Sequence, residues 1–169
     1  MKYQEINILS KKISKFKKKG KKIILCHGVF DLVHIGHIKY LRAAKKLGDI
    51  LVVSITNDKF VNKGPGSPYF KVKERIEFLT SLDFVDFICI SNNFESIDVI
   101  NKIKPNYYCK GKDYSLSKNK LTKEIKNELK ALKTFNGKFK IIHEQKFSSS
   151  TLLNNFFDKF DKDQVNFIK

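Results

Sequence analysis

The chain has 169 residues, of which 41% are hydrophobic and 30% are charged, and its formal net charge is +17. This length and composition fit one domain with a real core, and we expect no second full domain within these residues. The charge raises the question of nucleic-acid binding, but only Arg42 and Arg75 among the 34 basic residues are arginines. Bidentate hydrogen bonds to bases and phosphates favour arginine over lysine. We therefore expect a general attraction to anionic substrates rather than a nucleic-acid site.

The cysteines and the N-terminus indicate the compartment. Cys26, Cys89 and Cys109 are widely spaced within apolar runs, which predicts buried thiols rather than a disulfide framework or a zinc site. The N-terminus lacks the apolar stretch of a signal peptide, and no apolar run is long enough to span a bilayer. We therefore expect a cytoplasmic protein without a membrane segment.

Short apolar runs alternate with amphipathic stretches along the chain. The runs that predict strands are Ile23 to Phe30, Ile50 to Thr56, Asp86 to Ser91, Asn106 to Gly111 and Lys138 to Glu144. The stretches that predict helices are His37 to Asp49, Val72 to Val85, Ser96 to Pro105, Leu121 to Leu132 and Ser148 to Phe160. Residues 57–70 are rich in glycine and proline and predict a loop without regular structure.

This alternation predicts a parallel sheet that helices cover on both faces. We expect an α/β fold with a Rossmann-like, doubly wound, five-stranded parallel sheet. Residues 1–20 are expected to form a lysine-rich N-terminal helical appendage, residues 21–157 the domain, and residues 158–169 a polar C-terminal tail or linker. Ligands of such sheets bind at the carboxyl ends of the strands, at the switch point.

Two of the four histidines lie in the stretch GVFDLVHIGHIKYL, residues 28–41, directly after the first predicted strand. His34 and His37 flank a helix start, where backbone N–H groups and the helix dipole suit a phosphate. Their imidazoles add donors for charge that develops on a phosphoryl group, and Gly36 leaves room for a triphosphate. The alternative is a helix start with two partly exposed histidines, but the HxGH spacing at this turn favours a phosphate site.

These residues carry a resemblance to a known family. GVFDLVHIGH resembles the signature of the nucleotidyltransferase superfamily that includes the cytidylyltransferases, and the resemblance continues through VNKGPGSP, KERIEFLTSLDFVD, KPNYYCKGKDY and FSSSTLL. KGPGSP and KGKDY make the chain most similar to the heptose-1-phosphate adenylyltransferase domain. The glycerol-3-phosphate cytidylyltransferases come next.

The resemblance implies that residues 21–157 are a nucleotidyltransferase domain. A phosphate oxygen of a phosphorylated sugar or polyol would attack the α-phosphorus of CTP or ATP, and pyrophosphate would leave without a covalent enzyme intermediate. Mg²⁺ would arrive with the nucleoside triphosphate. The product would serve lipopolysaccharide or capsule synthesis, and a homodimer is expected.

The resemblance also implies roles for individual residues. His34, His37, Lys63 and Arg75 would bind phosphates and stabilise the transition state, and Asp31, Asn57 and Asp58 would lie near the acceptor. The residues expected to bind the nucleotide are Gly28, Val29, Phe30, Gly36, Lys110, Gly111, Lys112, Asp113, Ser149, Ser150 and Thr151. No protein side chain is expected to hold the metal.

Two positions depart from the family's pattern. Glycerol-phosphate enzymes carry an arginine before the final hydroxyl motif, where this chain has only Lys146, a point charge rather than a fork. That motif usually also has a glycine at the position of Phe147. The first departure weakens the glycerol-phosphate alternative, and the second leaves the heptose acceptor open.

Two other classes of protein share features with this chain. Residues 34–37 spell the HIGH signature of class I aminoacyl-tRNA synthetases, but the chain is too short for an anticodon-binding domain and lacks a KMSKS-like loop. A non-catalytic nucleotide- or RNA-binding module is the other alternative, and the intact His34, His37 and Arg75 argue against it.

Overall fold

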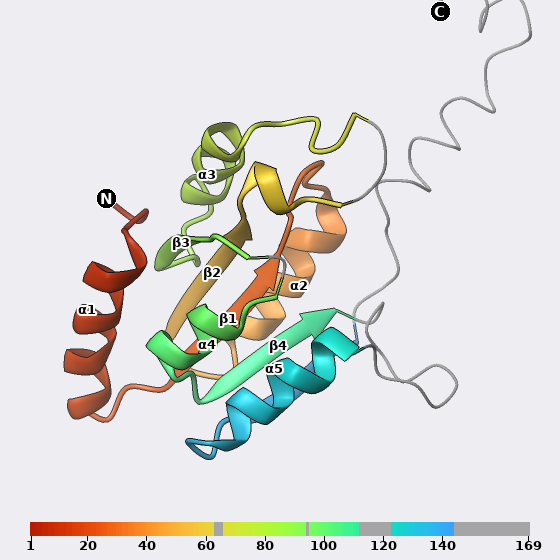
Figure 1. Cartoon of the computed structure of the whole chain (residues 1–169). Coiled ribbons are helices and arrows are strands. Elements are labelled where there is room, and N and C mark those ends of the chain that lie inside the picture. Colours follow the sequence, from red (N-terminus) through yellow and green to blue (C-terminus); the bar gives the residue numbers. More distant parts are fainter. Residues whose placement is uncertain (63–65, 94, 112–122, 144–169) are drawn as a thin grey trace, which may run out of the picture.

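The computed structural model describes residues 1–62, 66–93, 95–111 and 123–143, and strands from these ranges form one sheet (Figure 1). The strands are β1 (Ile23–Gly28), β2 (Ile50–Thr56), β3 (Phe87–Ser91), β4 (Tyr107–Gly111) and β5 (Lys138–Ile142). Their order is β3-β2-β1-β4-β5, and all neighbouring pairs are parallel. The predicted Rossmann-like α/β fold is confirmed.

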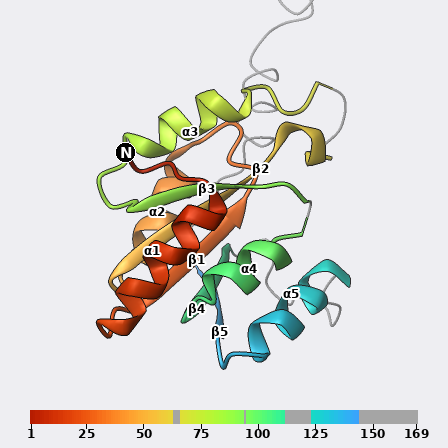
Figure 2. The ribbon, with the colours of Figure 1, turned by 60° about the vertical axis from the view of Figure 1, so that its left-hand side comes forward.

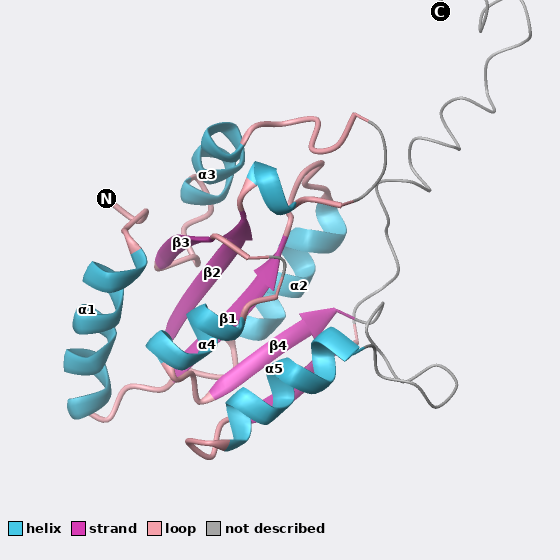
Figure 3. Ribbon diagram, in the orientation of Figure 1, coloured by secondary structure: helices cyan, strands magenta, loops and turns pink. Residues whose placement is uncertain are grey.

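Helices cover both faces of this sheet (Figures 2 and 3). They are α1 (Ile6–Lys18), α2 (Ile35–Lys45), α3 (Val72–Thr80), α4 (Ile97–Ile103) and α5 (Lys123–Lys133). Side chains of β1 alternate between the two cores: Ile23 and Leu25 pack with α1, α4 and α5, whereas Ile24 and Cys26 pack with α2 and α3. Because both faces are buried, the strands need the continuous apolar runs seen in the sequence.

The lysine-rich N-terminal segment forms a helix that packs directly on the sheet. Leu9 and Ile13 of α1, one helical turn apart, are fully buried in the core that also contains α4. Tyr3 adds a parallel bridge to Ile88, so the segment also covers the edge of β3. The segment therefore contributes to the core, while the domain boundaries at residues 20 and 157 stay predictions.

Two local predictions are wrong in detail. The stretch 57–70 is not entirely irregular, since η1 (Asp58–Phe60) forms one turn of 3₁₀ helix with Asn57 as its N-cap. The helix α3 ends at Thr80 rather than Val85. There the hydroxyl groups of Thr80 and Ser81 donate to helix carbonyl oxygens, a pattern that competes with continued helix. The helix expected at Ser148 to Phe160 lies outside the described residues.

The three cysteines are buried and free, as predicted. Burial raises the pKa of Cys89 to about 12 and raises the pKa of Cys26 well above its ordinary value. A thiol with so high a pKa is a poor nucleophile, so Cys26 and Cys89 act as small apolar core residues.

The described part of the chain contains no helix that is both long enough and apolar enough to cross a membrane.

The strand order defines where a ligand should bind. From β1 the chain runs outward through β2 and β3 on one side, and then returns to place β4 and β5 on the other side. The switch point therefore lies at the carboxyl ends of β1 and β4. The stretch after β1, residues 28–41, begins at this point.

Candidate active site

The two histidines of the motif cap the first turn of α2 and face each other. His34 is the N-cap, and its Nδ1 accepts a hydrogen bond from Gly36 N–H at 3.0 Å. The Nδ1 of His37 accepts a hydrogen bond from His34 N–H at 3.3 Å, and the ring centroids are 4.1 Å apart. Because Nδ1 is the acceptor in each ring, a neutral imidazole carries its proton on Nε2. The spacing of three residues thus gives a reciprocal helix cap and two Nε2–H donors beside a helix N-terminus.

A strained phenylalanine holds the turn between β1 and these histidines. Phe30 has φ of 51°, which is rare for a bulky residue, yet its side chain is only 4% exposed. Its ring contacts His37 edge-on with 5.6 Å between centroids. A Cβ at Gly28 would lie 3.2 Å from the same ring, so glycine suits this position. Gly28, Phe30 and His37 therefore fix one another by packing.

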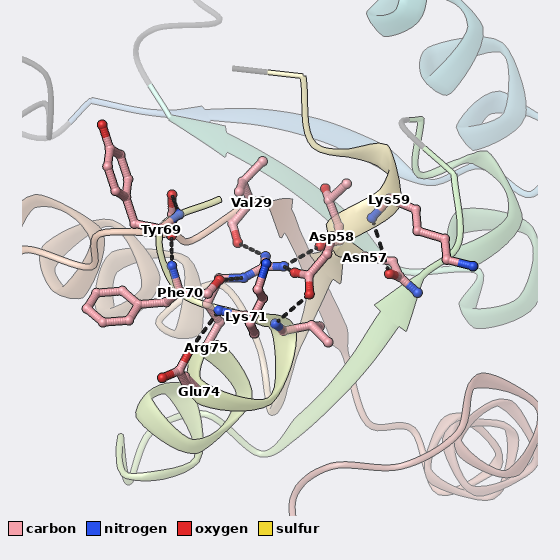
Figure 4. A network of polar contacts seen from close by, with 12 residues as sticks. Val29, Asn57, Asp58, Lys59, Tyr69, Phe70, Lys71, Glu74 and Arg75 are labelled. Carbon is pink, nitrogen blue, oxygen red and sulfur yellow. Dashed lines mark hydrogen bonds and ion pairs between the residues drawn. The ribbon is translucent and has the colours of Figure 1, made fainter. Parts of the chain in front are cut away.

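Arg75 binds the chain segments around this turn together (Figure 4). Its guanidinium donates to the carbonyl oxygens of Val29 at 2.5 Å, Thr56 at 2.9 Å and Phe70 at 3.0 Å, and to Asp58 Oδ1 at 2.6 Å. Arg75 is only 1% exposed. We call Arg75 and its four partners, Val29, Thr56, Asp58 and Phe70, the Arg75 cluster. Four of the five N–H donors of the guanidinium therefore have protein acceptors, so most of its binding capacity serves the scaffold.

The residues predicted to lie near the acceptor have protein partners as well. Both carboxylate oxygens of Asp31 accept backbone hydrogen bonds, from Tyr69 and Phe70 at 2.8 Å each. The second oxygen of Asp58 accepts from the backbone N–H of Val72 at 3.3 Å. Asn57 donates from its amide to Asn92 at 2.9 Å. The two Asp31 contacts fasten the loop after η1 to the motif, and the predicted acceptor contacts stay predictions.

A second polar cluster lies on the opposite face of the sheet, under α5. Glu128 of α5 accepts hydrogen bonds from the Ser96 backbone and hydroxyl at 3.0 and 2.8 Å, and from the Tyr108 hydroxyl at 2.9 Å. Its carboxylate also pairs with Lys110 Nζ at 3.7 Å. All four residues are buried. We call them the buried polar cluster.

Within the buried polar cluster, the charges of Lys110 and Glu128 shift the pKa of each other. Burial lowers the pKa of Lys110, and the Glu128 charge partly offsets that effect. Burial raises the pKa of Glu128, but the Lys110 charge and the Ser96 hydrogen bonds outweigh it and hold that pKa below its ordinary value. Each group thus favours the charged form of the other, against the effect of burial.

The structure brings together the predicted residues at the ends of β1 and β4. Cys26 and Cys109 are register partners, so the next residues, His27 and Lys110, lie level at the carboxyl edge. Gly111 is the last residue of β4, and a Cβ there would meet no atom within 4 Å. Six predicted site residues lie outside the described part of the chain: Lys63, Lys112, Asp113, Ser149, Ser150 and Thr151.

Sequence reasoning missed the buried polar cluster, although one signal was present. Glu128 follows Ile125 by three residues and precedes Leu132 by four, so it lies on the apolar face of its helix. A carboxylate on such a face indicates a buried partner. Within the described ranges, no group of three His, Cys, Asp or Glu residues is arranged to hold a metal ion.

Residues 25–156 match the sequence model of the family described as cytidylyltransferase-like. The chain belongs to the cytidylyltransferase-like family. Its parallel sheet is thus that of a nucleotidyltransferase domain. The resemblance drawn from the motifs is confirmed.

Named relatives extend this assignment. The bifunctional protein HldE of Sulfurimonas denitrificans is 36% identical over 138 residues, which make up 80% of this chain and 28% of that protein. The lipopolysaccharide core biosynthesis protein of Thermoplasma volcanium has a structure with a TM-score of 0.59 and 27% identity, covering 76% of this chain and 100% of that one. A pantoate-beta-alanine ligase of Francisella tularensis shares the fold, with a TM-score of 0.58 and 20% identity over 91% of this chain and 73% of that one.

Proposed function

We propose that this nucleotidyltransferase domain transfers a nucleoside monophosphate from ATP or CTP to a phosphorylated sugar and releases pyrophosphate. The observation that supports it best is the arrangement of His34 and His37. Both rings accept backbone hydrogen bonds at Nδ1, beside the N-terminus of α2 and at the switch point of the sheet. Such a site suits a triphosphate, because its two imidazoles lie at the end of the helix that favours anions.

The reaction needs one displacement at the α-phosphorus. An oxygen of the acceptor phosphate forms the new bond, and the bond from the α-phosphorus to the bridging oxygen of pyrophosphate breaks. Imidazole donors at Nε2 would stabilise the negative charge that grows on the phosphoryl oxygens. The rest of the catalytic effect would come from holding the two substrates in line.

The relatives and the motifs support one substrate class. HldE proteins match this chain over most of its length, and the Thermoplasma protein is named for lipopolysaccharide core biosynthesis. Together with the KGPGSP and KGKDY motifs, they support a sugar 1-phosphate of the heptose type as acceptor and ATP as donor. The chain spans 28% of the HldE relative, so we also propose that this domain can occur as one part of a larger bifunctional protein.

Three further features belong to this proposal. Mg²⁺ would enter as part of the nucleotide substrate, where it neutralises phosphate charge. The domain would act in the cytoplasm, where nucleoside triphosphates are made. A homodimer is proposed from the family resemblance.

A pyrophosphate-release screen tests the proposal. The four nucleoside triphosphates with MgCl₂ are each combined with heptose 1-phosphate, glucose 1-phosphate and glycerol 3-phosphate. We expect release with a sugar 1-phosphate and with either ATP or CTP. Release only with glycerol 3-phosphate and CTP would replace the sugar by a small phospho-alcohol. No release from any pair, with folded protein, would contradict the proposed reaction.

A further inference from the structure

Glu128 is a buried carboxylate that joins three elements of the fold. It is 2% exposed, it accepts from the backbone and hydroxyl of Ser96 at the N-cap of α4, and it accepts from Tyr108 in β4. Ser96 donates twice to Oε1 and Tyr108 donates to Oε2, so a neutral glutamine amide could keep the two Ser96 contacts at its oxygen while its NH2 group donates to the Tyr108 hydroxyl. The feature that requires a negative charge is Lys110, whose ammonium lies 3.7 Å away.

Lys110 occupies a position that matters for a ligand at the switch point. It is the penultimate residue of β4, and its Nζ donates to the carbonyl oxygen of His27 in β1 at 3.5 Å. His27 comes one residue before the end of β1, where the turn to His34 and His37 begins. The ammonium group thus lies between the two strand ends that define the switch point.

A buried lysine in this position is costly unless its charge is used. Lys110 is 4% exposed, and replacing a buried ion pair by apolar residues of similar size is often neutral or stabilising. The fold alone therefore does not call for this pair. A triphosphate at the switch point would instead gain from a fixed positive charge, since a charge in a poorly solvated site is weakly screened.

We propose that Glu128 is a positioning residue for nucleotide binding: it holds the Lys110 ammonium between the carboxyl ends of β1 and β4, where the charge of Lys110 attracts the nucleotide phosphates. The inference rests on the proposed function, and it assigns a role to α5 that the motifs do not contain. Glu128 acts through Lys110 and does not touch the substrate.

A double-mutant cycle on nucleotide affinity tests this role. Dissociation constants of Mg-ATP and Mg-CTP are measured by calorimetry without acceptor, for the wild type, Glu128→Gln, Lys110→Met and the double variant. We expect each single variant to weaken binding on the order of tenfold, as for the loss of one charge-assisted contact. In the Lys110→Met background, Glu128→Gln should weaken binding no further.

Two readouts separate positioning from a structural role. The double variant removes both charges, so its melting temperature should recover toward that of the wild type while its affinity stays low. In Glu128→Gln, the loss of the negative charge lowers the pKa of Lys110 further. As the pH rises, Lys110 should therefore lose its charge earlier in the variant, and nucleotide affinity should begin to fall at a lower pH than in the wild type. Among the described residues, the groups near Lys110 include Glu128 on α5, Cys26 and His27 on β1, and Tyr108 on its own strand.

The controls keep the result interpretable. Lys126→Met removes an exposed lysine from the same helix and should bind like the wild type. Should Glu128→Gln unfold, Glu128→Asp keeps the charge but withdraws it by one methylene group, and it should still weaken binding.

Three results would overturn the inference. The first is an equal loss of nucleotide affinity when Glu128→Gln is made in the wild type and in Lys110→Met. The second is wild-type affinity in the double variant. The third applies if Glu128→Gln fails to fold, and is wild-type affinity in Glu128→Asp. Pyrophosphate release by the wild type together with one of these results would remove this inference and leave the proposed function. Wild-type protein that binds neither nucleotide would remove both.

Discussion

Arg75 donates from Nη2 to Asp58 at 2.6 Å, and the same guanidinium reaches Val29 in the turn that precedes the paired histidines. The contact to Val29 spans 46 residues of sequence and the contact to Asp58 spans 17. Arg75 therefore fixes the turn after β1 relative to the end of β2. This places Arg75 under the site as a support for its loops.

Replacing Arg75 by lysine should destabilise the fold. A lysine ammonium is a single point and cannot reach four acceptors in the directions of a guanidinium, so the buried Thr56 contact and the partly buried contacts to Val29 and Phe70 could not all be kept. We expect the free energy of unfolding of Arg75→Lys, from urea titration, to fall by about 2–4 kcal/mol. Arg42→Lys is the matched control, because Arg42 is exposed and lies over the Phe84 ring at 5.2 Å. The control should lose less than about 1 kcal/mol.

The same pair of variants tests the phosphate contact predicted from the sequence. If Arg75 mainly binds phosphate, Arg75→Lys should unfold like the wild type and show a higher KM for the nucleotide. That outcome would contradict the structural role of the Arg75 cluster.

The sequence predicts the elements well because their signals are local. Apolar runs locate all five strands of the described structure, and the three-residue spacing of His34 and His37 indicates a paired site at a strand-to-helix turn. The partners of Arg75 and Glu128 depend on contacts between distant segments, which no local pattern encodes. The left-handed backbone of Phe30 is hidden for a similar reason, since packing against Gly28 and His37 forces a conformation that phenylalanine disfavours by itself.

Removing the imidazole of His37 should slow the chemical step. If its Nε2–H stabilises charge in the transition state, His37→Ala should lower kcat on the order of 100-fold with little change in KM. The measurement is steady-state pyrophosphate release with the substrate pair found in the screen. A melting curve checks that the lost helix cap costs only about 1 kcal/mol.

Lys46→Ala controls for changes elsewhere on the same helix. Lys46 is the exposed C-cap residue of α2, at the opposite end from His37, and should keep the wild-type kcat. An unchanged kcat with a raised KM in His37→Ala would assign this histidine to ground-state binding alone.

Asp49 stabilises the fold at neutral pH, and this stabilisation is lost at acidic pH. Its carboxylate accepts a hydrogen bond from the Lys22 backbone at 2.8 Å and one from Lys21 Nζ at 3.2 Å. These two contacts lower the pKa of Asp49 below its ordinary value of 3.8. Because the folded-state pKa is the lower one, this stabilisation is present above the ordinary value and is lost as the pH falls through the folded-state pKa.

Asp49→Asn should therefore melt at a lower temperature than the wild type at neutral pH, and the difference should shrink to nothing at the acid end. The measurement is the melting temperature across a pH series, with Glu77→Gln, an exposed carboxylate on α3, as the control that should follow the wild type. A difference that stays constant down to acid pH would mean that the asparagine itself perturbs the turn before β2. Convergence at low pH would instead assign the effect to the charge of Asp49, which fastens the start of β2 to the start of β1 at the end of the sheet opposite to the histidines.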